Sequence, residues 1–217
     1  IFTGDKRTPR SIAQGVAYYR KAVEALRALA VELPRDNRIP KLLAQNLVGL
    51  ANSLVLAGEP READRLIGEA VAIAARLAAV DPGNAEGATD QLSVLAQAAL
   101  VAHRAGDPPR AIGHARAALA IAARLPGDTR RSRDVRSDVA DTRATLGRAL
   151  VARAGAPRHP PAARLADLRE ARGLFAEALA FLDEVRAEKL GAFAEEEERE
   201  LRDDLRRCEA ALARLPS

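Results

Sequence analysis

The chain has 217 residues, which fits one domain or two, and its formal net charge of +4 is small for a nucleic-acid-binding protein of this size. Hydrophobic residues make up 48% of the chain but aromatic residues only 3%, with no Trp and no Met, so a core of Ala, Leu and Val between closely packed helices is expected rather than a sheet. One cysteine, Cys208, excludes an intrachain disulfide framework, and three histidines far apart in sequence give no metal-ligand spacing.

Start and stop signals in the first half of the chain predict three long helices before the first strong break. Thr8 with Pro9 forms an N-cap and first turn, and the Asp-Pro-Gly-Asn sequence at residues 81–84 stops the chain, with Asn84 placed to cap the following helix. The three helices are expected over residues 8–33, 40–57 and 60–80.

In the second half, a Pro-Gly-Asp-Thr break at 126–129 precedes a helix predicted from Arg130 to Arg153. A Pro-rich loop that contains His159 follows, and then a long helix to about Leu190 that ends at Gly191. The last helix is expected to begin with Glu195 to Glu198 and to finish near Arg206 and Arg207, because acid at the start and base at the end suit the helix macrodipole.

Small residues recur at a fixed interval of 48 residues. Ala51, Ala63 and Ala70 correspond to Ala99, Ala111 and Ala118, and the run Ala-Ile-Ala-Ala-Arg-Leu occurs at both 72–77 and 120–125. The turn at 56–60, with Gly58 and Pro60, corresponds to the turn at 105–109. Small side chains allow two helices to approach to about 8 to 10 Å, and a helical repeat of this period favours stacked helix pairs.

On these residues the chain resembles the tetratricopeptide repeat family, whose bulky and small positions fall at the same spacings. The first full copy has Leu47, Leu50, Ala51, Leu54, Ala63, Ile67 and Ala70. The second copy has Leu95, Ala98, Ala99, Ala102, Ala111, Ala115 and Ala118. A third copy, with an insertion, begins at Asp138 and has Leu146, Gly147, Leu150, Ala171, Phe175 and Ala178, but Arg143 stands where a bulky apolar residue is usual. A partial copy has Gly15, Tyr19 and Ala22.

The resemblance implies an all-α fold, a right-handed α-solenoid of antiparallel helix hairpins with repeats of about 48 residues and a C-terminal capping helix. The expected single domain divides into a partial repeat at 1–37, repeats at 38–84, 85–128 and 129–190, and a capping helix at 191–217. The third repeat carries an inserted loop at 154–161.

The C-terminal sequence resembles one particular group of tetratricopeptide arrays. The sequence from Cys208 to Leu212, after the break at Gly191 and a charged helix, is similar to the tetratricopeptide arrays that follow the kinase domain in some bacterial serine/threonine protein kinases. The kinase sequence motifs themselves do not occur in this chain. Because the chain starts at Ile1 without a Met, we expect it to be a piece of a longer protein, in which a kinase domain could lie upstream.

By analogy with the family, the first helix of each hairpin would line a concave groove for a peptide or a partner domain. The candidate groove residues are Gln45, Asn52, Ser93, Gln97, His103, Asp141, Thr145 and Arg148. An ordinary solvent-facing role remains the alternative for each of them. Relatives that hold a C-terminal carboxylate resemble one another in a clamp of two lysines, two asparagines and an arginine. Those places here hold Val48, Asn52, Gln97, Asp141 and Thr145, so only Asn52 matches, no cation remains, and a free carboxylate is not expected to bind.

Other chemically tempting residues have simpler interpretations. Cys208 is expected to be a small buried residue, and Glu195 to Glu200 point in different directions around a helix, which suits a solvated first turn better than a metal site. The Arg-rich stretch at 130–136 is interleaved with Asp residues and lacks a nearby aromatic side chain for stacking on bases. We therefore expect no catalytic residue, no metal, no cofactor and no nucleic-acid partner.

The expected function is that of a non-catalytic protein–protein interaction scaffold, not an enzyme. The alternative is a regulatory or sensor segment of a larger bacterial signalling enzyme, such as a serine/threonine protein kinase. The longest charge-free stretch, Leu42 to Gly58, is too short to span a bilayer comfortably, so no membrane segment and a cytoplasmic location are expected.

Overall fold

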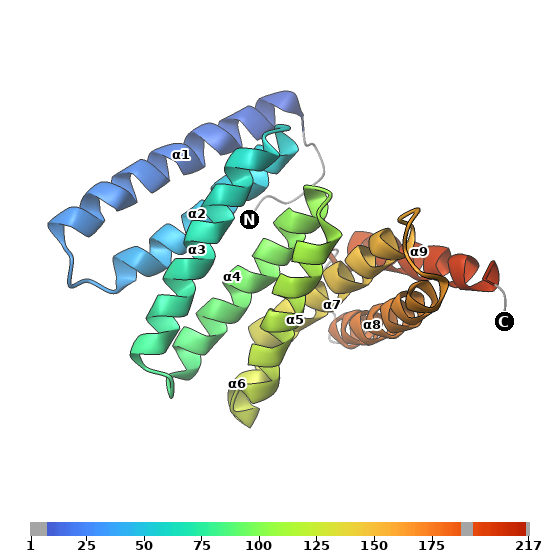
Figure 1. The fold of residues 1–217 in the computed structure, drawn as a ribbon. Coiled ribbons are helices and arrows are strands. Elements are labelled where there is room, and N and C mark those ends of the chain that lie inside the picture. Colours follow the sequence, from blue (N-terminus) through green and yellow to red (C-terminus); the bar gives the residue numbers. More distant parts are fainter. Residues whose placement is uncertain (1–7, 188–192, 216–217) are drawn as a thin grey trace.

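The structure, a computed structural model, describes residues 8–187 and 193–215 and is all-α over that part of the chain, as the sequence predicts (Figure 1). The helices are α1 (Pro9–Glu32), α2 (Arg38–Leu56), α3 (Pro60–Val80), α4 (Ala85–Arg104), α5 (Pro108–Arg124), α6 (Gly127–Arg131), α7 (Arg133–Ala154), α8 (Pro161–Ala187) and α9 (Phe193–Ala213).

Helices α1 and α4 begin at the predicted capping residues. The Thr8 hydroxyl accepts a hydrogen bond from the backbone N–H of Ser11 at 3.2 Å, and Asn84 Oδ1 accepts from the N–H of Glu86 at 2.9 Å. Two glycines, Gly58 and Gly106, have left-handed φ angles of +84° and +77°, and each ends a helix at a tight turn.

Two helix boundaries differ from the prediction by more than two residues. The helix predicted from Arg130 instead begins at Arg133, because Ser132 is extended (ψ 146°) and its hydroxyl accepts a hydrogen bond from the N–H of Val135 at 3.4 Å. The preceding residues form the separate short helix α6. At the other end of the chain, α9 continues past Arg207 to Ala213. The predicted helix end at Leu190 and Gly191 lies outside the described residues.

Consecutive long helices lie side by side, and they fall into two rows. Row A consists of α2, α4 and α7, in which α2 contacts α4 and α4 contacts α7. Row B consists of α1, α3, α5 and α8, which contact the row A helices next to them in the chain. Helix α9 packs on α8 and also touches α7, so it closes the C-terminal end of row A.

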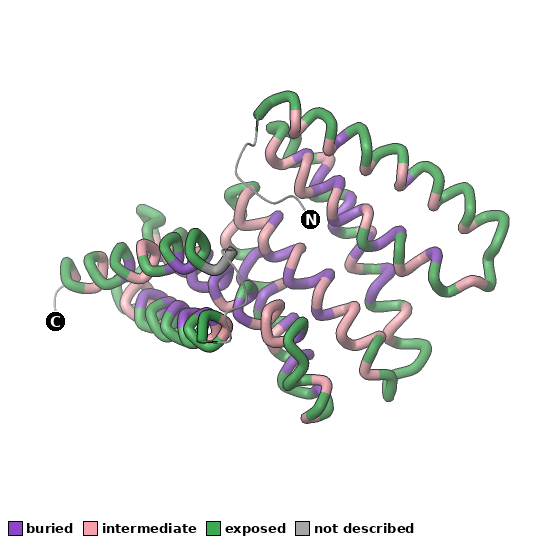
Figure 2. Tube along the Cα trace, turned by 180° about the vertical axis from the view of Figure 1, so that it is seen from behind, coloured by how far each residue is buried: buried purple, intermediate pink, exposed green. Residues whose placement is uncertain are grey.

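The core lies between the two rows, where buried residues concentrate, whereas α1 is largely exposed (Figure 2). All six alanines of the 48-residue recurrence are at most 1% exposed: Ala51, Ala63, Ala70, Ala99, Ala111 and Ala118. Glycine permits still closer approach at Gly147, where an added Cβ would lie 2.6 Å from a ring carbon of Phe175. Small residues thus stand at helix contacts, as expected from the sequence.

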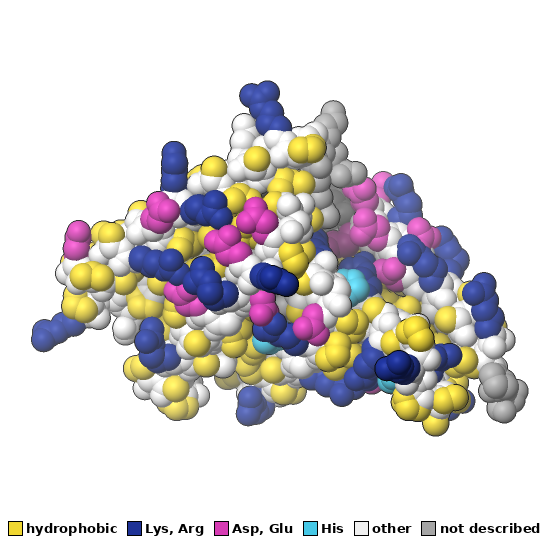
Figure 3. Space-filling view, turned by 45° about the horizontal axis from the view of Figure 1, so that its top comes forward, with side chains coloured by type: hydrophobic (Ala, Val, Ile, Leu, Met, Phe, Trp, Pro, Cys, Tyr) yellow, Lys and Arg dark blue, Asp and Glu magenta, His cyan; other side chains and the backbone are white. Residues whose placement is uncertain are grey.

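Ion pairs connect successive helices of each row. In row B, Arg27 bonds to Glu69 at 2.7 Å between α1 and α3, and Arg110 bonds to Asp64 between α5 and α3. In row A, Lys41 reaches Asp90 at 2.8 Å between α2 and α4. Basic and acidic side chains are correspondingly interleaved on the molecular surface (Figure 3). Because exposed pairs each contribute only about 0 to 1 kcal/mol, they align neighbouring helices more than they stabilise the fold.

Within the described ranges 8–187 and 193–215, α2 is the one helix long and apolar enough to be a candidate membrane span. Its mean hydropathy is 1.2 over the relevant window, and 44% of that window is buried inside the protein. Leu47, Leu50 and Leu54 of α2 are at most 2% exposed and belong to the core cluster that also includes residues of α1, α3 and α4. The apolar character of α2 therefore has a structural explanation within this fold.

Candidate functional site

A hollow of about 250 Å³ is lined by residues of the row A helices α4 and α7 and of α8 and α9. We refer to it as the α4–α7–α9 hollow. Four of the eight predicted groove residues line it, namely Gln97 on α4 and Asp141, Thr145 and Arg148 on α7. The sequence repeat places these residues on two different helices, and the contact of α4 with α7 brings them together.

The floor of the hollow is apolar. Its largest members are Leu100 on α4, Leu182 on α8 and Leu201 on α9. Four alanines complete this surface: Ala96, Ala140, Ala144 and Ala178. Leu182 and Leu201 are 8% and 3% exposed, so they belong to the core and give the floor a fixed shape. Such a surface favours the aliphatic part of a ligand, because burying it removes apolar area from water.

The wall of the hollow is predominantly acidic. Its carboxylates are Asp138, Asp141, Glu197 and Glu200, and its cations are Arg104 and Arg148. Arg148 Nε donates to Asp204 Oδ2 of α9 at 2.6 Å, and both side chains are partly buried. The guanidinium that the sequence offered for binding a ligand is therefore engaged in holding α9 against α7.

Burial and repulsion between carboxylates raise the pKa values of acidic side chains in this wall. Desolvation by the surrounding residues raises the pKa of Asp141 to about 7, and the nearby charges of Glu197 and Asp138 act in the same direction. Asp141 remains exposed at the mouth of the hollow, so it is both accessible to a ligand and partly removed from bulk water. Burial also raises the pKa values of Asp138 and Glu197. The charge of Arg148 opposes this rise for Asp141 and Glu197, but burial outweighs it.

The other four predicted groove residues also lie on row A, but outside the lining of this hollow. Asn52 on α2 accepts a hydrogen bond from Arg104, which connects it to the wall, and Ser93 on α4 bonds to the side chain of Asp138. His103 is half-buried in the last turn of α4, where burial and Arg148 lower its pKa. Gln45 is exposed on α2.

Several lining residues were not predicted from the sequence. Glu197, Glu200 and Leu201 come from α9, which was expected only to cap the end of the solenoid, and Leu182 comes from α8. A signal was available in α9, because Glu197, Glu200 and Leu201 are spaced by three and four residues and share one helix face. The repeat could not reveal which helix this face meets.

Two other charged clusters hold the structure together. Arg153 forms two hydrogen bonds, of 2.8 and 2.7 Å, with the buried carboxylate of Asp167, and His159 Nε2 lies 2.9 Å from that carboxylate. Burial opposes ionisation there, but Arg153 and His159 outweigh it and lower the pKa of Asp167. Glu198, 4% exposed, lies 2.6 Å from Arg186 and 2.7 Å from Arg202. The first cluster fixes the 155–160 loop, and the second joins α8 to α9.

Cys208 occupies a buried place, as its sequence context predicted. It is 0% exposed, and its Sγ lies 3.2 Å from the backbone carbonyl oxygen of Leu168. Burial raises the pKa of the thiol, which keeps it protonated near neutral pH. Across residues 8–187 and 193–215, no group of three or more His, Cys, Asp and Glu side chains is placed to hold a metal ion.

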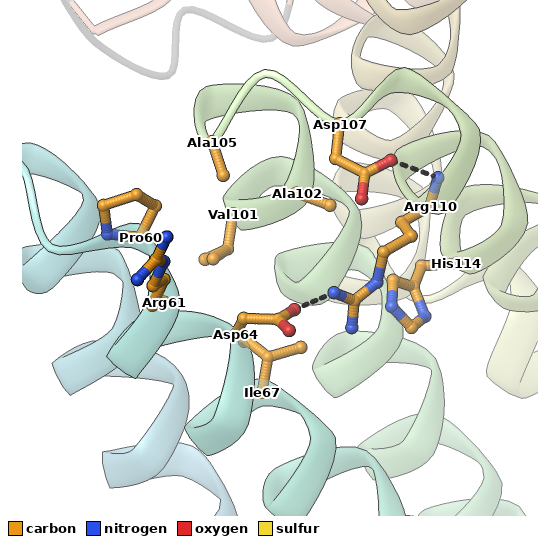
Figure 4. A pocket seen from close by; sticks show the side chains of 10 residues that line it. All are labelled: Pro60, Arg61, Asp64, Ile67, Val101, Ala102, Ala105, Asp107, Arg110 and His114. Carbon is orange, nitrogen blue, oxygen red and sulfur yellow. Dashed lines mark hydrogen bonds and ion pairs between the residues drawn. The ribbon is translucent and has the colours of Figure 1, made fainter.

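A second hollow, of about 230 Å³, lies where α3 meets the ends of α4 and α5 (Figure 4). Asp64 and Arg110 point toward each other across it and form an ion pair, and His114 lies beside Arg110. Burial and Arg110 lower the pKa of His114, which favours its neutral form. Opposite charges are therefore paired within this hollow, unlike those in the α4–α7–α9 hollow.

No protein-family model matches this chain, and no curated protein sequence matches it. One matching solved structure is that of BtubC (BKLC) from P. vanneervenii, with a TM-score of 0.47 and 16% sequence identity. The match covers 97% of this chain and 90% of that chain. A likeness of this degree carries no argument about the arrangement of the helices or about function.

Proposed function

We propose that this chain is a non-catalytic interaction scaffold that binds a peptide or a partner domain along row A. The observation that carries the proposal is the convergence of Gln97, Asp141, Thr145 and Arg148 over an apolar floor in one hollow. Asp141 is exposed and Gln97 and Arg148 are half-buried beside buried leucines, so the hollow offers hydrogen-bonding groups and apolar area, the two components that a peptide ligand needs. A cytoplasmic setting is part of the same proposal.

The proposal includes the finer architecture, a right-handed tetratricopeptide-like solenoid with repeats of about 48 residues. Helices α3 and α5 begin at Pro60 and Pro108, and the left-handed glycines Gly58 and Gly106 precede them, so both features recur at the sequence interval of 48. In such an array the first helices of the hairpins form one continuous surface, and α2, α4 and α7 would be those helices.

A random peptide library displayed on phage tests the proposal directly. Peptides enriched on the wild-type chain are synthesised, and their affinities are measured by calorimetry for the wild type and two variants. Gln97→Trp places a bulky ring in the hollow, whereas Gln14→Trp makes the same change at an exposed position on α1 in row B.

We expect the enriched peptides to bind the wild type and Gln14→Trp equally, and to lose at least tenfold in affinity for Gln97→Trp, on the order of one well-packed contact. Circular dichroism of both variants checks that they are folded. Failure to enrich any peptide, or equal affinity for Gln97→Trp and the wild type, would contradict the proposed function.

A further inference from the structure

We propose that the α4–α7–α9 hollow accepts a lysine or arginine side chain from a basic segment of the partner polypeptide. This inference rests on the proposed function, because it names the chemistry of the ligand for the same surface. Two independent features of the hollow lead to it: its apolar floor and the sign of its charge.

The charge of the hollow is complementary to a cation. Four carboxylates face two guanidinium groups in the lining. Arg148 is held by Asp204, which lies outside the lining, and its charge lowers the pKa values of Asp141 and Glu197 less than burial raises them. Arg104 donates a hydrogen bond to Asn52 Oδ1, which also lies outside the lining. An incoming ammonium or guanidinium group would therefore meet carboxylates that lack sufficient compensation from the protein itself.

The arrangement of the carboxylates favours a side chain that reaches in from outside. Asp138 and Asp141 belong to α7, and Glu197 and Glu200 belong to α9, so acidic groups of two different helices line the hollow. Because Asp141 and Glu197 are exposed, a partner can contact them without first unfolding any element. A ligand that bridges the two helices would gain from both carboxylate pairs.

The apolar floor selects an organic cation over an inorganic one. A lysine or arginine side chain carries a hydrocarbon stem that can lie on Leu100, Leu182 and Leu201 while its charged end contacts the acidic wall. A metal ion would instead require several ligating groups at short distances, and the described part of the chain offers no such cluster. An anionic peptide segment would be repelled by the same wall.

The test uses the complete chain and four pools of a random peptide library that differ at one fixed position. That position is lysine, arginine, norleucine or glutamate, and norleucine supplies the hydrocarbon stem without the charge. Each pool competes with a fluorescent peptide selected on the wild type, and binding is measured by fluorescence anisotropy. The variant Asp141→Asn/Glu197→Gln removes two carboxylates, and Glu24→Gln on the exposed face of α1 is the matched control.

We expect the lysine and arginine pools to compete at roughly tenfold lower concentration than the norleucine pool with the wild type and Glu24→Gln. In Asp141→Asn/Glu197→Gln this preference should largely disappear, while competition by the norleucine pool stays the same. For the wild type, raising the salt concentration should weaken the lysine pool more than the norleucine pool, a comparison that does not depend on the folding of any variant.

The outcomes separate the two proposals. Competition by the norleucine or glutamate pool at least as strong as that by the lysine pool would overturn the inference. The scaffold function would still stand in that case if Gln97→Trp abolished peptide binding. A lysine preference that persists in Asp141→Asn/Glu197→Gln would place the cation elsewhere and would also overturn the inference. If no pool competes and no peptide binds, both proposals fail.

Discussion

The contact between Gly147 on α7 and Phe175 on α8 allows a quantitative test of the helix packing that positions Asp141 and Thr145. An alanine Cβ at position 147 would lie 2.6 Å from Cε1 and 2.9 Å from Cζ of Phe175. Phe175 is 1% exposed, so its ring has no open space into which it can move. Gly147→Ala must therefore separate α7 from α8 or force the ring out of its preferred rotamer.

Two opposing effects set the magnitude. Overpacking a well-filled core costs about 1 to 3 kcal/mol, whereas replacing glycine by alanine inside a helix gains up to about 1 kcal/mol. We expect Gly147→Ala to lower the free energy of unfolding by about 1 kcal/mol. Gly173 on α8 is the matched control, because it is exposed and a Cβ there would meet nothing within 4 Å. Gly173→Ala should raise the free energy of unfolding by about 0.5 to 1 kcal/mol.

Urea unfolding followed by circular dichroism measures both variants. A double variant, Gly147→Ala/Phe175→Ile, replaces the Gly–Phe pair by an Ala–Ile pair. The first full repeat has this combination at the corresponding positions, Ala51 and Ile67. The loss in free energy of unfolding in the double variant should be smaller, by about 0.5 kcal/mol or more, than the sum of the losses in the two single variants. The reason is that isoleucine leaves room for the added methyl group. The packing argument would be refuted if Gly147→Ala had the same free energy of unfolding as Gly173→Ala. It would also be refuted if the effects of the two single substitutions added exactly in the double variant.

Three further predictions concern the hollow and the core. Asp141→Asn should raise the melting temperature at pH 8 but not at pH 4. Since the folded chain raises the pKa of this carboxyl from 3.8 to about 7, its ionisation destabilises the fold progressively between those values and fully above them, by on the order of 1 kcal/mol after allowing for its solvent exposure. Ala51→Leu and Ala99→Leu should each lower the free energy of unfolding in urea by on the order of 1 to 3 kcal/mol, because both alanines are 0% exposed. Variants as stable as the wild type would show that these positions accept a larger side chain. A peptide ending in Glu-Glu-Val-Asp with a free carboxylate should show no appreciable binding by calorimetry, because it would meet the acidic wall. Micromolar binding that disappears on amidation of its C-terminus would contradict that expectation.

Local chemistry made most helix boundaries predictable. Thr8, Asn84 and Asp107 each accept a hydrogen bond from a backbone N–H in the first turn of their helix, as their side chains and positions indicate. Ser132 has the same capacity, but it lies among arginines in a stretch that the sequence pattern predicts as one helix from Arg130. Its hydroxyl caps α7 and a new helix starts there, so the break is encoded locally by a single side chain.

The position of Arg143 shows where the apolar pattern alone was insufficient. The repeat calls for a bulky apolar residue there, but the side chain of Arg143 pairs with Glu177 of α8 at 2.8 Å and is 34% exposed. An arginine can cover a helix contact with its hydrocarbon stem while its charged end reaches a partner at the edge. The contact between α7 and α8 thus tolerates a charged residue at this place, and Gly147 and Phe175 fill the adjacent core.

The charge of the hollow could not be predicted because it depends on a helix outside the repeat pattern. Asp204 lies 56 residues from Arg148, and α9 has no counterpart in the other repeats whose spacing would align the two. From the sequence alone, the candidate residues here include one acid, Asp141, and one base, Arg148, which leave the net charge of the site undecided. In the structure Asp204 binds Arg148, and Glu197 and Glu200 join the wall, so acidic groups predominate in the site. A capping helix that shields the end of a core can therefore also decide which charge the neighbouring groove accepts, because it supplies acidic side chains to the wall and engages the cation already there.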